Sequence, residues 1–201
     1  MMYITDNSRI LSREELSTPE EITNEIPLDK ESSKLIFGAR RSISQILHRQ
    51  DDRVIVVVGP CSIHDPLAAV EYAEKLKNLE SSLSSELKII MRVYFEKPRT
   101  TIGWKGLIND PNLDDSYDVN KGLREARKIL LNINEIGLPA ATEYLDIITP
   151  QYISDLISWG AIGARTTESQ VHRDLASGLS CPVGFKNSTN GSIQVAIDAI
   201  G

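Results

Sequence analysis

The sequence predicts an α/β fold, and within that class a (β/α)8 or TIM barrel of which about the first five βα units are present. From Arg53 onward, short apolar runs alternate with longer stretches of helical periodicity, and no Gly-x-Gly-x-x-Gly turn interrupts them. Polar residues collect just after the predicted strands, which favours a barrel over a doubly wound sheet. The 201 residues fall short of the roughly 250 that a complete barrel needs, so we expect a truncated or fragmentary barrel.

Residues 1–50 are predicted to form an N-terminal helical arm with an interface or regulatory role, and residues 51–201 the partial barrel. The run Ser17-Thr18-Pro19-Glu20-Glu21 has the pattern of a helix cap followed by an acidic first turn. Apolar residues at helical spacing then predict a longer helix over residues 30–49. No strong strand pattern occurs in this part of the sequence.

The first barrel unit begins with the β-branched run at residues 54–58, which is typical of a strand buried on both faces. Asp65 as the cap and Pro66 at the first position predict the following helix. A second strand is predicted over residues 88–95. The later elements follow the same alternation: a helix over 123–136 closed by Gly137, a strand over 138–144, a helix from Thr149 or Pro150 to Trp159 ended by Gly160, a strand over 161–164, a helix over 170–179, a strand over 182–186 and a helix from Ser192.

Composition excludes several classes of protein. The formal net charge of −6 argues against broad nucleic-acid binding, which requires a basic face. No apolar run approaches the roughly 20 residues of a membrane span, and the N-terminus has no signal-peptide pattern. Two cysteines without a Cys-x-x-Cys pair indicate a cytoplasmic protein with free thiols.

Cations gather at the predicted strand ends of this acidic protein. They are Arg92, Lys97, Arg99, Arg165 and Lys186. A mouth lined by one sign of charge concentrates ions of the opposite sign, and Arg and Lys suit phosphate and carboxylate. We therefore expect a small phosphorylated metabolite that also carries a carboxylate. The alternative is a solvated rim in which the cations pair with Glu96, Glu143 and Glu168.

Two further residues at the same face admit two interpretations each. Glu143, at the end of the third strand, could hold a water or a substrate proton, or could only pair with a neighbouring cation. Cys61, at the end of the first strand, could be a metal ligand, although a lone cysteine is more often a small buried apolar residue.

Several long motifs together resemble one family. They are Gly59-Pro60-Cys61-Ser62-Ile63-His64-Asp65, residues 91–101 (MRVYFEKPRTT), residues 103–111 (GWKGLINDP), residues 160–170 (GAIGARTTESQ) and residues 182–187 (PVGFKN). These motifs are similar to those of class I phospho-2-dehydro-3-deoxyheptonate aldolase, the DAHP synthase family of bacteria and fungi. The resemblance covers essentially the whole chain, including the arm.

The resemblance implies a (β/α)8 barrel that condenses phosphoenolpyruvate with erythrose 4-phosphate and uses a divalent Mn, Fe, Co or Zn ion. Cys61 is similar to the family's thiolate ligand. The remaining ligands of the family come from later strands, so we expect the 201-residue chain alone to have little or no activity. The residues that resemble the phosphoenolpyruvate cradle are Arg92, Lys97, Ala164, Arg165 and Lys186. Those that resemble the erythrose 4-phosphate contacts are Lys97, Pro98, Arg99 and Thr100.

The same resemblance gives catalytic roles to Lys97, Glu143 and Lys186, and implies an oligomer inhibited by an aromatic amino acid, with phenylalanine favoured. The residues that resemble the effector pocket are Asp6, Asn7, Ile10, Pro150, Gln151, Leu175, Leu179 and Ser180. These residues could instead only pack a dimer interface. Two other functions stay open: a Schiff-base aldolase with Lys186 or Lys97 as nucleophile, and a non-catalytic effector-binding or oligomerisation fragment.

Overall fold

A five-stranded parallel sheet forms the centre of the computed structural model, which describes residue 3 and residues 5–200. Residues 1, 2, 4 and 201, which belong to the expected arm and barrel ranges, lie outside the described residues. The strands are β1 Val54–Val58, β2 Leu87–Arg92, β3 Ala140–Glu143, β4 Trp159–Ile162 and β5 Val183–Phe185. They lie in chain order, and every neighbouring pair is parallel. This confirms the predicted partial barrel, because successive βα units place each strand beside the one before it.

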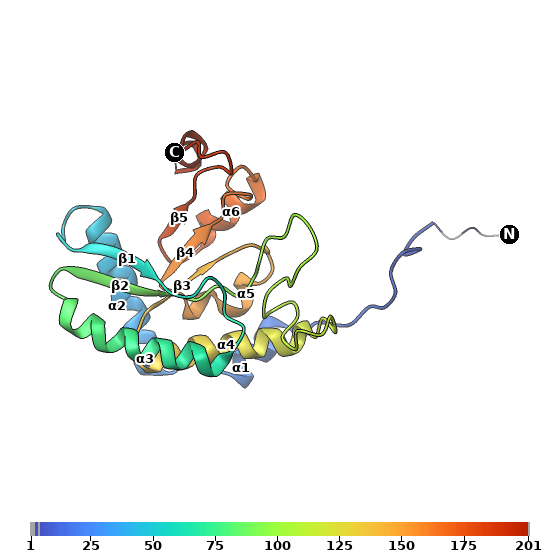
Figure 1. The fold of residues 1–201 in the computed structure, drawn as a ribbon, viewed down its shortest axis with the longest axis horizontal. Coiled ribbons are helices and arrows are strands. Elements are labelled where there is room, and N and C mark those ends of the chain that lie inside the picture. The colour runs from blue at the N-terminus through green and yellow to red at the C-terminus, as the bar shows by residue number, and fades with distance from the viewer. Residues whose placement is uncertain (1–2, 4, 201) are drawn as a thin grey trace.

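Helices connect the strands and pack against the sheet (Figure 1). They are α1 Pro19–Glu25, α2 Lys30–Leu47, α3 Pro66–Leu83, α4 Val119–Glu135, α5 Pro150–Ile153, the 3-10 turn η1 Ser154–Leu156, α6 Gln170–Gly178 and α7 Gln194–Ile200. The two predicted caps are present: Thr18 and Glu21 form a reciprocal capping box, and Asp65 accepts from the first turn of α3. Such caps satisfy backbone N–H groups that have no partner inside the helix.

Several predicted elements differ in their extent. The strand expected over residues 88–95 ends at Arg92, and the strand expected over 161–164 spans Trp159–Ile162. The largest difference is in a helix. The helix expected from Pro150 to Trp159 ends at Ile153, a 3-10 turn follows, and Trp159 and Gly160 belong to β4. Gly160 is a strand residue that pairs with Thr142 of β3. A Cβ there would lie 2.8 Å from the ring of Tyr144, just after β3, so the glycine makes room for a packed aromatic ring and does not end a helix.

The alternation of side chains along β2 separates the core from the functional face. Ile89, Met91 and Val93 belong to the main core, which also contains the buried faces of α3 and α4. Ile90 belongs to a second cluster with Ala141 of β3 and Ile43 of α2. The arm helix α2 thus contributes to both clusters, with Ile36 in the main core and Ile43 in the second. Arg92 and Tyr94 follow Ile90 on the inner face of the sheet, at the carboxyl end of the strand.

Candidate active site

The inner face of the sheet collects polar side chains at the carboxyl ends of four strands. Cys61 follows β1, Arg92 ends β2, Glu143 ends β3 and Lys186 follows β5. Because all the strands are parallel, these ends open on the same mouth, which is where barrel enzymes place their sites.

Cys61 lies at the centre of the first group of cations. Lys97 Nζ is 3.1 Å from Cys61 Sγ and 3.1 Å from its carbonyl oxygen, to which Arg92 also donates at 3.2 Å. The hydrogen bond from Lys97 lowers the pKa of the Cys61 thiol, and the charges of Lys97, Arg92 and Arg99 lower it further. Burial opposes this effect. The structure therefore brings three of the predicted cations to one exposed thiol.

Lys186 and Glu143 form the second group. Lys186 Nζ lies 2.5 Å from Glu143 Oε2, with a side-chain exposure of 42% for the lysine and 10% for the glutamate. Gly163, just beyond β4, makes room for this carboxylate, because a Cβ there would lie 2.3 Å from Glu143 Oε1. The hydroxyl of the buried Thr167 lies 2.9 Å from the carbonyl oxygens of both Gly163 and Lys186, which fixes the loop after β4 beside the end of β5.

The ring of Tyr94 joins the two groups. Arg92 Cζ is 4.2 Å from the ring centroid, and Lys186 Nζ is 5.0 Å from it. Arg92 has no ion pair with an acidic side chain within the described residues, and its Nε is buried without a hydrogen-bond partner. A buried donor without a partner is costly, so the guanidinium is left with capacity for an anionic ligand.

A hollow of about 340 Å³ continues the mouth beyond β2. It is lined by Glu96, Lys97, Pro98, Arg99, Lys105, Asn109, Leu145 and Asp146. Three of the residues predicted to contact the second substrate therefore line one space. Burial raises the pKa of Glu96 to about 7, and the charge of Asp146 adds to the rise.

The other residues predicted to contact the substrates are more exposed. Thr100 and Arg165 are exposed, and Ala164 is half-buried. Arg165 forms no ion pair in the described part of the chain, in contrast to the alternative in which the cations only pair with carboxylates. Lys186 does follow that alternative, through Glu143.

The profile of one protein family, described as the DAHP synthetase I family, matches residues 23–201. The chain belongs to this family.

Relatives in the family cover the whole of this chain. The chain is 62% identical to the Phe-sensitive phospho-2-dehydro-3-deoxyheptonate aldolase of Escherichia coli K12 and covers 57% of that protein. It is 57% identical to a Trp-sensitive enzyme of the same name from Buchnera aphidicola, again over 57% of that protein. The chain thus spans a little over half the length of the relatives it matches.

Solved structures agree with the family assignment. The phospho-2-dehydro-3-deoxyheptonate aldolase of Francisella tularensis SCHU S4 is 61% identical and superposes with a TM-score of 0.93, over 95% of this chain and 56% of that one. A DAHP synthase from Thermotoga maritima is 23% identical with a TM-score of 0.53 over 73% of this chain and 36% of that one, which shows the shared fold alone.

Cys61 is the one residue of this chain that the sequence predicts as a metal ligand. Within residue 3 and residues 5–200, no group of three or more His, Cys, Asp or Glu side chains lies close enough together to hold a metal ion. Catalytic metal sites commonly take three protein ligands, as catalytic zinc sites do. The residues at this mouth therefore do not by themselves fit a metal centre.

The residues predicted for effector binding are not gathered in one place. Pro150 and Gln151 begin α5, whereas Leu175, Leu179 and Ser180 lie on α6 or just after it. The segment that carries Asp6, Asn7 and Ile10 runs out from the body, away from α5 and α6 (Figure 1). Ser180 lines a hollow of about 340 Å³ with Arg40 and Asp155.

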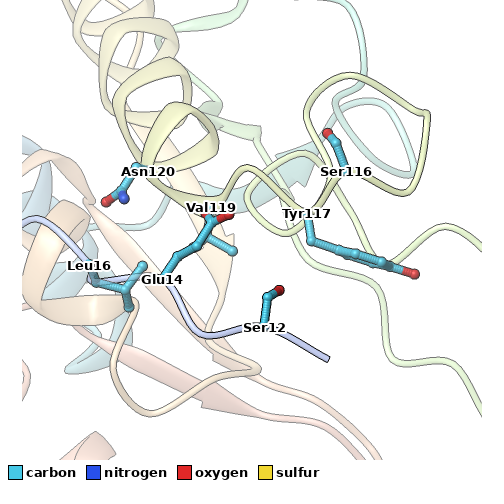
Figure 2. A pocket seen from close by; sticks show the side chains of 7 residues that line it. All are labelled: Ser12, Glu14, Leu16, Ser116, Tyr117, Val119 and Asn120. Carbon is cyan, nitrogen blue, oxygen red and sulfur yellow. The ribbon is translucent and has the colours of Figure 1, made fainter. Parts of the chain in front are cut away.

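Another hollow, of about 280 Å³, lies between the N-terminal segment and the loop before α4 (Figure 2). It is lined by Ser12, Glu14, Leu16, Ser116, Tyr117, Val119 and Asn120. Its one charged side chain is an acid, so it is not suited to a phosphate. Among the described helices, none combines the length and apolar character that crossing a membrane requires.

Reasoning from the sequence missed four residues of the mouth: Tyr94, Gly163, Thr167 and Lys105. Tyr94 had a usable signal, because it follows Arg92 by two positions and the alternation of an extended chain places both on one face. Gly163 and Thr167 had none, since their roles depend on Glu143 and Lys186, which come from other strands.

Proposed function

We propose that this chain forms the phosphate-binding half of a DAHP synthase site, which condenses phosphoenolpyruvate with erythrose 4-phosphate to give 3-deoxy-D-arabino-heptulosonate 7-phosphate and phosphate. One observation carries the proposal: the cations of two distant segments meet at one mouth. Arg92 and Lys97, at the end of β2 and beyond it, contact Cys61, and Arg92 shares the ring of Tyr94 with Lys186, which follows β5. An acidic protein places its cations together in this way to bind an anion.

Phosphoenolpyruvate suits this arrangement because it carries a phosphate and a carboxylate close together. A planar guanidinium can bind either group through two parallel hydrogen bonds, and an ammonium adds a compact charge. We assign the cradle to Arg92, Lys97, Arg165, Lys186 and the backbone at Ala164. Arg165, which is exposed and without an acidic partner, is the cation most available to a ligand entering from solvent.

Erythrose 4-phosphate would occupy the hollow lined by Lys97, Pro98 and Arg99, with Thr100 at its exposed rim. Lys97 lies between the two substrates in this arrangement, since it also reaches Cys61. Fixed cations on both sides reduce the mutual repulsion of the two phosphates. Much of the catalysis would then be positioning and electrostatic stabilisation.

The reaction adds the enol carbon of phosphoenolpyruvate to the aldehyde carbon, which forms one carbon–carbon bond and an alkoxide. We assign to Lys97 the proton that this alkoxide takes up. Positive character then develops at the neighbouring carbon, and a water oriented by Glu143 adds there with loss of one proton to solvent. The carbon–oxygen bond to phosphate breaks, phosphate leaves with the electron pair, and the remaining hydroxyl loses its proton to give the ketone. Glu143 pairs with Lys186, one of the cations that we assign to phosphate binding. The carboxylate is therefore held close to the phosphate that leaves.

A divalent metal stays a prediction for the whole protein, with Mn, Fe, Co and Zn as candidates and Cys61 as one ligand. The lowered pKa of Cys61 suits a thiolate ligand. No step is derived through a metal here, because the described residues supply this single thiol and no cluster of three ligands.

A Schiff-base mechanism has less support. It needs a neutral lysine amine as nucleophile, whereas Lys186 forms a close ion pair with Glu143. That pair occupies the amine that would have to attack the carbonyl. Reduction with borohydride in the presence of the product, whose ketone can condense with a lysine amine, should trap a covalent adduct at Lys186 or Lys97 only if the Schiff-base mechanism operates.

We also propose that an aromatic amino acid regulates the whole protein, which would be an oligomer. The relatives are named as Phe-sensitive in Escherichia coli and Trp-sensitive in Buchnera, and the Phe-sensitive one is the more similar of the two. The segment with Asp6, Asn7 and Ile10 lies away from α5 and α6 of its own chain. An effector pocket built from both sets of residues would therefore need two subunits.

Isothermal titration of the chain with phosphoenolpyruvate tests the proposal. We expect binding that weakens with added salt and falls about ten-fold or more in Arg92→Leu and Lys186→Met, because each removes a cation from the cradle. Lys34→Met removes an exposed cation on α2 and is the matched control. Equal affinity in the wild type and Lys186→Met would refute the assignment.

Release of phosphate with both substrates present tests activity separately. We expect little or no product from the 201-residue chain, since the described residues lack a full set of metal ligands. Steady product formation by the purified chain would contradict that expectation.

A further inference from the structure

Tyr94 contacts two cations that reach it from opposite parts of the mouth. Arg92 Cζ lies 4.2 Å from the ring centroid and Lys186 Nζ 5.0 Å from it, both within the range of a cation–π interaction. β2 and β5 are not neighbours in the sheet, so backbone pairing does not hold these two cations in register. The ring is 6% exposed, so water competes little for its contacts.

Two cations that bind one anion repel each other while the anion is absent. A carboxylate between them would relieve this repulsion, but it would also compete with the ligand. An aromatic face attracts cations through its quadrupole and carries no net charge, so it stabilises them without adding a competing anion. Lys186 also pairs with Glu143, whereas Arg92 has no acidic partner among the described residues. Arg92 depends most on such a neutral neighbour. Its buried Nε has no hydrogen-bond partner, and its Nη2 donates to the carbonyl oxygen of Cys61.

We propose that Tyr94 is a positioning residue whose ring holds Arg92 and Lys186 at one anion position, so that it contributes to ligand affinity through these two cations. The identity of that anion as phosphoenolpyruvate rests on the proposed function. The positioning role itself requires only that the mouth binds a phosphate-bearing anion.

The competing explanation is that Tyr94 is a buried aromatic side chain that only fills space. The two explanations differ in what an aromatic replacement restores. Tyr94→Phe keeps the ring and loses the hydroxyl, whereas Tyr94→Met and Tyr94→Leu fill part of the volume without a π face. Tyr72, half-buried on α3, provides the matched control Tyr72→Leu, which removes a ring that packs against the main core.

Titration with phosphoenolpyruvate and with inorganic phosphate gives the first readout. We expect about ten-fold weaker binding in Tyr94→Met and Tyr94→Leu, a loss consistent with two cation–π contacts, and affinity within about two-fold of wild type in Tyr94→Phe. Equal affinities in the Phe and Met variants, both folded by circular dichroism, would overturn the inference. Phosphate binding that depends on the ring, without phosphoenolpyruvate binding, would support the inference and refute the proposed function. Absence of binding of either anion by the wild type would overturn both.

Nuclear magnetic resonance of the dimethylated lysines gives a second readout that needs no ligand. The Lys186 methyl signal, identified by its loss in Lys186→Arg, should be displaced by the ring current of Tyr94. The displacement should persist in Tyr94→Phe and in Tyr72→Leu and vanish in Tyr94→Met. A Lys186 signal that does not respond to loss of the ring would overturn the inference even if every variant folds.

Discussion

Gly163 shows how one missing side chain shapes the mouth. Its position leaves space for Glu143, since a Cβ would lie 2.3 Å from the carboxylate oxygen that it would displace. Glu143 in turn holds Lys186. The loop after β4 therefore helps to set the positions of two side chains, Glu143 at the end of β3 and Lys186 just after β5.

Gly163→Ala should force Glu143 out of its place and separate it from Lys186. We expect a loss of about 1–3 kcal/mol in the free energy of unfolding, as for other overpacked sites, together with weaker phosphate binding. Urea unfolding and titration calorimetry measure the two effects. Gly178→Ala is the control, because a Cβ at Gly178 meets nothing within 4 Å. Unchanged phosphate affinity in Gly163→Ala would show that the pair tolerates the displacement.

Glu96 makes stability depend on pH. Burial, followed by the charge of Asp146, raises its pKa from an ordinary 4.5 to about 7. The folded state therefore binds more protons than the unfolded state between these values, and stability falls as the pH rises through this window. The change in pKa corresponds to roughly 3 kcal/mol.

Urea unfolding at pH 5 and pH 8 should show the chain less stable at the higher pH. Glu96→Gln, which cannot ionise, should remove most of this difference and stabilise the protein at pH 8. Glu71→Gln on the exposed face of α3 should leave the difference intact. A wild-type chain as stable at pH 8 as at pH 5 would mean that Glu96 ionises without penalty.

At the scale of elements, two arginines on α4 connect the barrel to the arm. Arg127 is fully buried and donates to the carbonyl oxygens of Ile26 and Tyr152 and to both carboxylate oxygens of Asp155, at 2.7–2.9 Å. Arg124 is more exposed and pairs with Glu25 at 2.7 Å. The two side chains make similar connections at different depths.

Arg127→Leu should therefore cost about 3–5 kcal/mol, because it leaves buried carbonyl oxygens without donors. Arg124→Leu should cost less than about 1 kcal/mol, as solvent screens its pair. Thermal and urea unfolding of both variants measure the difference. Similar losses of stability in the two variants would indicate that burial does not determine how much each arginine contributes.

The sequence was most informative where local signals act alone. Thr18, Pro66 and Gly137 marked helix ends correctly, because caps and a positive φ are properties of a few adjacent residues. Trp159 and Gly160 were misassigned because their place in β4 depends on pairing with Ala141 and Thr142 of β3, which the local pattern does not show. The attachment of the arm through Arg127 was equally invisible, since its partners lie 25 or more residues away along the chain.

At the scale of the whole molecule, the sheet ends at β5 within the described residues, and α7 beside it is poorly covered. Ile193, Ile197 and Ile200 are 66%, 54% and 74% exposed. Grouped apolar residues at a surface commonly lead to association.

Sedimentation velocity should therefore show that the chain associates as its concentration rises. Ile197→Lys should shift the distribution towards the monomer, because it places a charge in the apolar group. Thr189→Lys adds the same charge at an exposed polar position nearby and should have less effect. Identical profiles for the two variants would place the contact surface elsewhere.

The barrel assignment followed from alternating patterns, which need no knowledge of distant contacts. The convergence on one mouth followed too, because parallel strands send their carboxyl ends to the same side. What the patterns could not give is which cations share a partner. That Arg92 and Lys186 meet at Tyr94 depends on the curvature of the sheet between β2 and β5.

The order of the strands has a consequence for synthesis. A ribosome releases β1 first and β5 last, so each strand emerges beside a neighbour that is already in place. The arm helices α1 and α2 differ, because they leave the exit tunnel before the strands that cover Ile22, Ile36 and Ile43 exist. We expect the nascent chain to expose these two helices until β3 has emerged, which makes them available to a chaperone.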